Sequence, residues 1–466
     1  MWNHQKLNAY QGALFNKVSQ LIEYYIEQGI LIAGERLPSE RELANILNIN
    51  RTTVVRALDN LSERGLLIRR QGSGTFVNDK KWGVQAYTSI NWRLPARFYQ
   101  NKQSRYQQKV ELIRRQQSNI IDLANGDLPT IWMPKLLLPN ISSDELIMHE
   151  KNSDQLQLGL PALKTQISNY MQQRFAMSVE TSQILITSGT QQSLFLITQG
   201  LLKSGDAIAI ESPSYFYSLP LFQAAGLRLY GIECDNEGIT LDSLSKVVSQ
   251  QPIKWLFLNP IFQNPLGFVM SDKRKKEILA FCRSQCIGIV EDDAYSGLAF
   301  NSQLSISPIK KFDHHNQVIY LGSLSKYIGR NIRVGWMIAP RNIIENLANI
   351  RQHIDSGLSI LPQLLAEEYL KNHYFTHQHF LSEQLNFKAN QLMVWLNNYF
   401  DDTINYQKPL GGFHLYAQLP VKSSQQEIAI LNQLLAQNII VSQGSDYGDK
   451  LGWIRLSYGH FNQNLV

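Results

Sequence analysis

Four short apolar segments in the second half of the chain each run directly into a polar cluster. They are DAIAI (206–210) before ESPSYFY, KWLFL (254–258) before NPIFQNPLG, CIGIV (286–290) before EDDAY, and QVIYL (317–321) before GSLSK. Helical patterns alternate with these segments, which is typical of a mostly parallel α/β sheet. Ligands of such sheets bind beyond the carboxyl ends of the strands. The pattern therefore predicts one shared site, with Lys326 at the fourth strand end.

Length and composition set the broad class. A chain of 466 residues predicts two or three domains, and 44% hydrophobic with 18% charged residues is an ordinary globular composition. We find no signal-like N-terminal segment and no apolar run of membrane-spanning length, so we expect a cytoplasmic protein without a membrane partner. Cys282 and Cys286 lie four residues apart without a further His or Cys to complete a metal set, so no metal site is expected.

The first eighty residues predict three helices followed by a small hairpin. Apolar residues recur at helical spacing from Leu14 to Tyr25, and Ser39 with Glu42 forms a capping box that opens a second helix. A third helix begins at Arg51 and ends near Gly65. The segments LLIRR and TFV, joined by QGSG, predict two short strands with a glycine-rich tip. This order describes a winged helix-turn-helix.

A recognition helix reads DNA from its N-terminal residues, where arginine pairs with guanine and threonine contacts base edges or phosphate. LPSERELA, NRTTVVRAL and GSGTFV closely resemble the DNA-binding domain of the GntR family over residues 12 to 78. That resemblance implies that the operator contacts are Arg41, Arg51, Thr52, Thr53, Gln71 and Gly72. The predicted partner is double-stranded operator DNA, and the predicted domain is residues 1–78.

A basic segment follows the predicted DNA-binding domain. Between Lys81 and Arg115 there are eight Lys or Arg residues and one acid, Glu111, together with many Gln and Asn. We interpret residues 79–118 as a linker, either a solvated tether or one that also touches DNA phosphates. The domain after it is predicted over residues 119–466.

The polar clusters of this second domain suit one cofactor. Gly189, Thr190 and Gln191 open a helix after the strand ILIT, and a helix N-terminus favours phosphate. Ser323 and Arg333 could also bind the phosphate, and Tyr215 offers a ring that could stack on the cofactor. Asp292 offers a carboxylate for a protonated ring nitrogen, and Asn264 and Tyr295 could hydrogen-bond a phenolate oxygen. Together with a lysine, this set describes pyridoxal phosphate held as a Schiff base on Lys326.

The order SGTQQ, QNPLG, EDDAY and S-x-S-K with a later arginine resembles the fold-type I aminotransferases from about Ile120 to Gly459. The resemblance implies an α/β fold with a large, mostly parallel sheet domain and a smaller α+β subdomain. It gives the residues named above the same roles, with Lys326 as the Schiff-base lysine. The later segments GGFHLYAQL and WIRLSYG place Arg455 where the α-carboxylate of a substrate is bound.

The two halves in this order resemble the MocR-type subgroup of GntR regulators, which implies a homodimeric transcriptional regulator. It would sense an amino compound or the cofactor itself, and occupancy at Lys326 would change the spacing of the two DNA-binding modules. The alternative is a working aminotransferase with an accessory DNA-binding module, and a third reading is a fold retained only for dimerisation. Tyr217 stands where some relatives carry an extra arginine, which disfavours an ω-amino or dicarboxylate effector, and Arg330 replaces a common proline or small residue.

Overall fold

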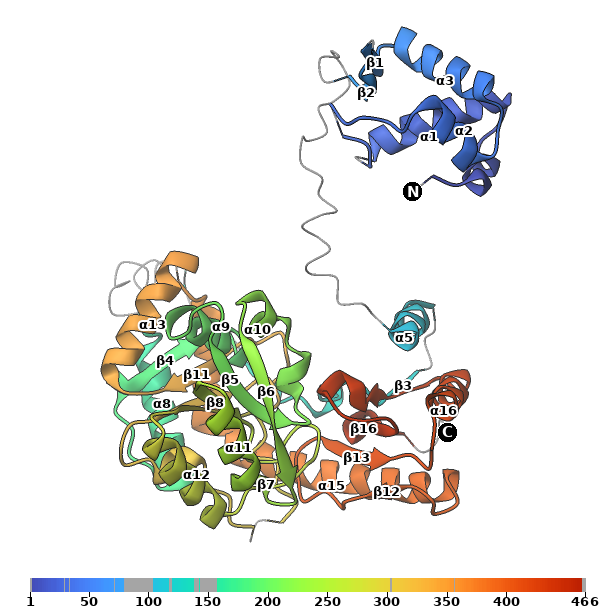
Figure 1. Cartoon of the computed structure of the whole chain (residues 1–466). Coiled ribbons are helices and arrows are strands. Elements are labelled where there is room, and N and C mark those ends of the chain that lie inside the picture. Colours follow the sequence, from blue (N-terminus) through green and yellow to red (C-terminus); the bar gives the residue numbers. More distant parts are fainter. Residues whose placement is uncertain are drawn as a thin grey trace. The chain divides into compact units, whose positions relative to one another are not determined.

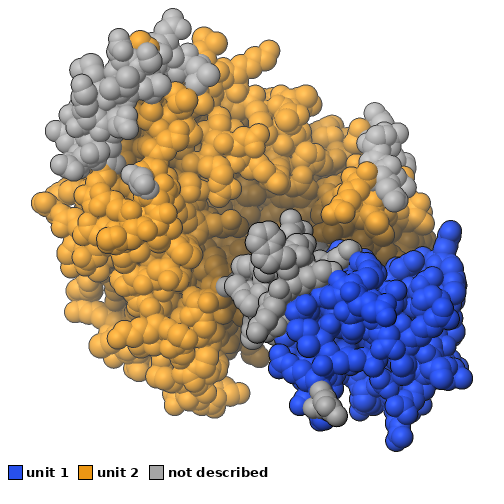
Figure 2. Space-filling model, turned by 90° about the horizontal axis from the view of Figure 1, so that it is seen from above, with its two compact units in different colours: residues 1–102 blue, residues 103–466 orange. Residues whose placement is uncertain are grey.

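A computed structural model of the chain describes residues 2–28, 30–32, 34–70, 72–78, 104–116, 120–137, 142, 157–301, 304–355 and 357–462. The chain divides into two compact units, Met1–Lys102 and Gln103–Val466, coloured separately in Figure 2. No described helix is both long and apolar enough to cross a membrane. Nor do the described side chains include three His, Cys, Asp or Glu grouped closely enough to hold a metal ion.

The first unit is the predicted winged helix-turn-helix. Its elements are α1 (Leu14–Glu27), α2 (Glu40–Leu47), α3 (Arg51–Glu63), β1 (Leu67–Arg70) and β2 (Gly74–Val77), after a short 3-10 helix η1 (His4–Ala9). The capping box of Ser39 and Glu42 is confirmed, because each side chain bonds to the backbone N–H of the other residue. Buried apolar residues of all three helices and of the antiparallel wing form one core, which includes Leu58.

The second unit is built on an eight-stranded sheet in the order β4-β11-β10-β9-β8-β5-β6-β7. Neighbours from β10 to β6 are parallel, as predicted, while β11 and the edge strand β7 are antiparallel. The strands are β4 (Ile184–Thr187), β5 (Ala207–Ser212), β6 (Arg228–Asp235), β7 (Gly238–Ile239), β8 (Ile253–Leu258), β9 (Gly288–Asp293), β10 (Val318–Ser323) and β11 (Gly335–Ile338).

Helices cover both faces of this sheet (Figure 1). One face packs against α9 and α13, and the other against α8, α11 and α12. The helices of this domain are α8 (Pro161–Phe175), α9 (Thr190–Gly200), α10 (Pro220–Ala224), α11 (Leu241–Gln250), α12 (Asp272–Ser284), α13 (Arg341–Ile354) and α14 (Ile360–Glu368). Burial on both faces explains why the central strands are continuous apolar runs rather than alternating ones.

The smaller subdomain carries an antiparallel sheet in the order β12-β13-β16-β15 and a two-stranded parallel sheet of β3 and β14. The long helix α15 and helices α5 and α16 complete it. The bounds are α5 (Arg105–Gln116), β3 (Ile121–Asp122), α15 (Tyr374–Tyr399), β12 (Asn405–Tyr406), β13 (His414–Gln418), α16 (Ser424–Ala436), β14 (Ile439–Ile440), β15 (Ser442–Gln443) and β16 (Trp453–Ser457).

Helix α5 lies within the segment that we interpreted as a linker. Tyr106, Val110 and Ile113 recur at helical spacing and pack with Ile440 of the second unit, and the Tyr106 hydroxyl donates to the carbonyl oxygen of Val441 at 2.9 Å. We did not predict this helix, because basic and amide residues dominate the segment and its apolar stripe is short. Residues 105–116 are therefore part of the second unit, whereas 79–103 and 117–119 lie outside the described residues.

Candidate functional site

Lys326 lies just after β10, beside the segment that follows β3. Its Nζ donates to the carbonyl oxygen of Gly126 at 2.7 Å and lies 4.0 Å from Asp127 Oδ1. Burial, the largest cause, and the positive charge of Arg455 together lower the pKa of this amine to about 8, while Asp292 acts in the opposite direction. A lysine whose pKa falls toward neutrality has more of the unprotonated, nucleophilic amine. The structure thus places a reactive type of lysine at the predicted strand end.

Asp292 lies near the end of β9, the strand that neighbours β10. Only 2% of its surface is exposed, and its Oδ1 has no hydrogen-bond partner among the described residues. Burial, the largest cause, and the negative charge of Asp293 together raise the pKa of this carboxyl to about 8, while Lys326 opposes the rise. A buried acceptor without a donor is costly in a folded protein. This oxygen therefore suits a ligand that brings an N–H or O–H group.

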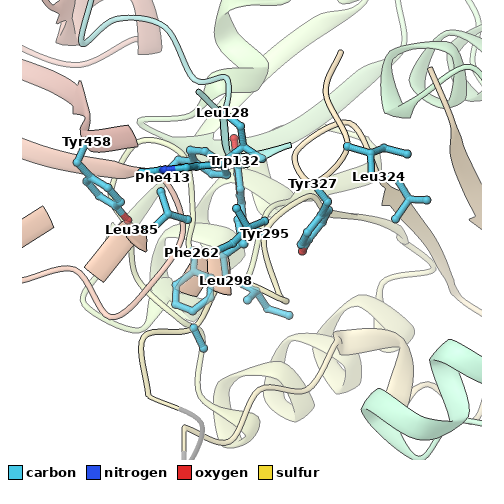
Figure 3. Packing of buried hydrophobic residues seen from close by; sticks show 14 of the residues in the cluster. Leu128, Trp132, Phe262, Tyr295, Leu298, Leu324, Tyr327, Leu385, Phe413 and Tyr458 are labelled. Carbon is cyan, nitrogen blue, oxygen red and sulfur yellow. The ribbon is translucent and has the colours of Figure 1, made fainter. Parts of the chain in front are cut away.

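Asn264 and Tyr295 lie on the side of the site that faces the small subdomain. Asn264 Oδ1 accepts from Arg455 Nη1 at 3.1 Å, and the Tyr295 hydroxyl lies 3.3 Å from His414 Nε2. Figure 3 shows the ring of Tyr295 close to Phe413, with their ring centroids 5.9 Å apart. Both side chains are buried, and burial raises the pKa of Tyr295 above its ordinary value.

Tyr215 begins the 3-10 helix η4 (Tyr215–Ser218) after β5. Its backbone N–H donates to the carbonyl oxygen of Asn264 at 3.0 Å, which ties the two strand ends together. Its hydroxyl has no hydrogen-bond partner among the described residues, and its ring packs against that of Phe216. Tyr217, two residues on, is exposed.

The predicted phosphate ligands gather at the start of α9. Gly189 caps this helix with φ +97°, and a Cβ there would come within 3.5 Å of an Arg333 nitrogen. Arg333 also donates from Nε to the carbonyl oxygen of Ser188 at 3.2 Å. Ser323 Oγ accepts from the backbone of Ser325 and is buried. Thr190 and Gln191 occupy the first turn of the helix, the former half-buried and the latter exposed.

Arg455 on β16 closes the site from the small subdomain. It is 7% exposed, its Nη2 donates to the carbonyl oxygen of Ala124 at 2.6 Å, and its Nε has no partner among the described residues. A buried guanidinium with an unused N–H is suited to a carboxylate. Arg330 is exposed and pairs with Asp127 and Asn125.

Two features of this site were missed in the sequence. One is His414, which is buried against Tyr295, and the other is the segment of residues 124–127, which accepts hydrogen bonds from both Lys326 and Arg455. A histidine on an otherwise apolar strand was the available signal for the first. No signal marked the second, because its hydrogen bonds with Lys326 and Arg455 use backbone carbonyl groups, which every residue carries.

The predicted DNA contacts gather at the second and third helices and the wing of the first unit. Asn50 caps α3, so Thr52 and Thr53 lie in its first turn beside Arg51. Arg51 is exposed and pairs with Glu40 at 2.9 Å. Arg41 is exposed on α2, and Gly72 at the wing tip has φ +75° with open space around it. Gln71 lies outside the described residues.

Comparison with known proteins agrees with this division. Residues 14–77 match the gntR family of bacterial regulatory proteins, and residues 118–465 match the class I and II aminotransferases. The chain is 32% identical over 459 residues to the uncharacterised HTH-type transcriptional regulator YdfD of Bacillus subtilis, covering 96% of this chain and 92% of that one. It is 29% identical to the HTH-type transcriptional regulator NorG of Staphylococcus aureus, covering 92% and 97%.

Solved structures match the second unit. A kynurenine aminotransferase of Pyrococcus horikoshii, in complex with PMP, is 25% identical with a TM-score of 0.69, covering 79% of this chain and 94% of that one. An archaeal alanine:glyoxylate aminotransferase is 26% identical with a TM-score of 0.67, covering 77% and 90%. The predicted fold-type I architecture is thereby confirmed.

Proposed function

The chain belongs to the GntR-type transcriptional regulators that carry a class I and II aminotransferase domain, the MocR-type arrangement, and from this we propose that it binds pyridoxal phosphate at Lys326 to control DNA binding. It is a DNA-binding regulator by family. The proposal concerns what the second unit senses, which residues hold it, and how the first unit responds.

The described residues fit the cofactor. Asp292 offers a buried, unpartnered oxygen to a protonated ring nitrogen, and Lys326 offers an amine whose pKa is lowered to about 8. When bound, pyridoxal phosphate supplies a carbonyl carbon that forms a Schiff base with the lysine, and a ring that withdraws electrons. The remaining contacts would come from Tyr215 against the ring, Asn264 and Tyr295 at its phenolate oxygen, and Gly189, Thr190, Gln191, Ser323 and Arg333 at the phosphate.

The effector would be an amino compound with one carboxylate, or the cofactor itself. Arg455 keeps an unpartnered Nε in a buried position, which favours a carboxylate there. Tyr217 carries no positive charge that could bind a second carboxylate. We therefore expect an effector other than a dicarboxylate or an ω-amino acid. The proposed assembly is a homodimer, since paired half-sites of an operator require two reading helices.

The observation that best supports this proposal is that three cationic side chains of the site contact residues 124–127. Lys326 Nζ bonds to Gly126, Arg455 bonds to Ala124, and Arg330 pairs with Asp127. The Lys326 nitrogen loses donor hydrogens once it is covalently engaged, and a carboxylate on Arg455 competes with the carbonyl oxygen of Ala124. We therefore expect ligands that replace these contacts to favour another conformation of the segment.

The same segment leads back toward the DNA-binding unit along the chain. It follows β3, which pairs with β14, and α5 precedes β3 with Arg114 bonded to Asp122 at 2.8 Å. The residues before α5 connect to the first unit. Occupancy at Lys326 would thus act on the stretch of chain from which the DNA-binding unit is tethered.

A second candidate is an active aminotransferase, because Lys326, Asp292 and Arg455 are all present in one site. Steady turnover of an amino donor and a keto acid would favour it. The sensing role is preferred because the family relatives are regulators over nearly their whole length.

The test is a titration of the full-length protein against its own upstream intergenic DNA, with scrambled DNA at the same salt as reference. We expect selective binding whose affinity changes at least fivefold with pyridoxal phosphate, the lower end of usual allosteric coupling. Lys326→Ala should bind the same DNA and lose this response. Selective binding that ignores the cofactor in both proteins would refute cofactor sensing, and equal binding to scrambled DNA would bring the aminotransferase forward.

A further inference from the structure

His414 is a buried histidine to which the proposed function gives no role. It begins β13, and the register of the small sheet pairs it with Ser457 while pairing Tyr416 with Arg455. Residues two apart on a strand share a face, so Ser457 and Arg455 lie on the same face of β16. The intervening pair, Leu415 with Leu456, faces the apolar core instead. The sheet thus presents His414 and Ser457 beside the arginine of the site.

Both ring nitrogens of His414 are engaged. Nδ1 lies 2.9 Å from Ser457 Oγ, and Nε2 lies 3.3 Å from the hydroxyl of Tyr295. The edge of the ring also touches the site, because a Cβ on Gly126 would come within 3.2 Å of His414 Cε1 and 3.6 Å of Lys326 Nζ. Serine, imidazole and tyrosine therefore form a continuous chain of polar groups, and the imidazole in its middle lies close to Lys326.

The imidazole in this chain is neutral. Only 4% of His414 is exposed, and burial holds its pKa well below the ordinary value, with the positive charges of Arg455 and Lys326 acting in the same direction. The other titratable group facing it is Tyr295, which is protonated because burial raises its pKa. A neutral imidazole carries one proton, so one nitrogen donates and the other accepts.

We infer that His414, anchored by Ser457, is a positioning residue that orients the hydroxyl of Tyr295 toward the ligand of Lys326. In this arrangement the Ser457 hydroxyl donates to Nδ1, and Nε2–H donates to the oxygen of Tyr295. The phenolic proton of Tyr295 is then left to donate into the site. The inference rests on the proposed function, since the acceptor would be the phenolate oxygen of pyridoxal phosphate.

This arrangement predicts how the pH response of the bound cofactor changes. A hydrogen bond to the phenolate oxygen stabilises its charged form, and loss of such a bond shifts an associated pKa by about one unit. His414→Leu should therefore move the pH midpoint of the visible absorbance of the Lys326-linked cofactor, and Tyr295→Phe should move it in the same direction. His414→Gln, which can place a donor near Nε2, should move it less than half as far.

The decisive experiment is a double-mutant cycle on the full-length protein with pyridoxal phosphate, following that midpoint and the thermal unfolding of each variant. His414→Leu should have little further effect in a Tyr295→Phe background, because both changes remove one interaction. Equal shifts in the two backgrounds would overturn the inference and make His414 act on Lys326 or Arg455 directly. An unchanged midpoint in a folded His414→Leu protein would overturn it as well. Absence of a Lys326-linked absorbance in the unmodified protein would instead reject the proposed function.

Discussion

The two units each present an arginine that we expect to bind a ligand, and the two arginines lie in opposite settings. Arg51 on α3 has 54% of its side chain exposed and pairs with Glu40, whereas Arg455 on β16 is 7% exposed and bonds to Asn264 and Ala124. An exposed cation interacts weakly with each fixed partner and is free to exchange it for DNA. A buried cation depends on its partners, so a ligand that replaces one of them shifts the surrounding structure.

The largest expected effect tests whether the two units are separate folding units. Leu58 is fully buried in the core of the first unit, and Leu321 is fully buried in that of the second. Leu58→Ala should lower the free energy of unfolding of the first unit by about 2–5 kcal/mol because it leaves a cavity. Calorimetry should show one transition moved, and Leu321→Ala should move the other. If either change moves both transitions together, the units do not fold independently.

The next effect concerns the exposed arginine. Arg51→Ala should weaken operator binding by about 1–3 kcal/mol, the usual contribution of an arginine that reads a base. The absorbance of the Lys326-linked cofactor should not change. Arg64→Ala is the matched control, because Arg64 is similarly exposed but follows the other end of α3, where it pairs with Glu23. Equal losses in selective binding for the two variants would remove Arg51 from the reading surface.

The same contrast explains what the sequence could predict. The winged helix-turn-helix is encoded locally, since the capping box at Ser39 and the Asn50 cap fix the starts of α2 and α3 within a few residues. The strand ends of the second unit were also predicted, because parallel strands bring their carboxyl ends together. Contacts between residues of the two subdomains were not predicted. His414 meets Tyr295 across 119 positions, and Gly126 meets Lys326 across 200, so no local spacing records either contact.

The buried polar groups of the second unit should also show in its pH dependence. Burial raises the pKa of Glu211, on β5, to about 8, above the value of about 4.3 for an unfolded chain. The folded state then binds a proton that the unfolded state releases between these values, so stability falls as pH rises through this window. Glu211→Gln removes the titration and keeps an acceptor for the backbone N–H of Asn259, which bonds to Glu211 at 3.1 Å.

We expect this variant to lose less stability than the unmodified protein between pH 6 and 7, by up to about 1.4 kcal/mol. Chemical denaturation of the full-length protein at the two pH values measures this difference. Glu233→Gln is the control, since Glu233 is exposed on the neighbouring strand β6. Parallel pH profiles for Glu211→Gln and the unmodified protein would show that Glu211 is already ionised at pH 6.

The smallest effect is expected where an exposed arginine acts in the second unit. Arg330 has 64% of its side chain exposed, yet its partner Asp127 belongs to the segment held by Lys326 and Arg455. Arg330→Ala should therefore cost at most about 1 kcal/mol, the range of exposed ion pairs. Its effect should be local, an increase of up to about fivefold in amide hydrogen exchange of residues 124–127.

Arg341→Ala is the matched control, because the Arg341–Glu345 pair is similarly exposed but lies on α13. It should leave exchange in residues 124–127 unchanged. If Arg330→Ala also leaves this exchange unchanged, Lys326 and Arg455 hold the segment without a contribution from the exposed arginine. If exchange rises, an exposed ion pair stabilises the segment together with Lys326 and Arg455. The segment then responds to salt as well as to ligand, since salt screens exposed charges more than buried ones.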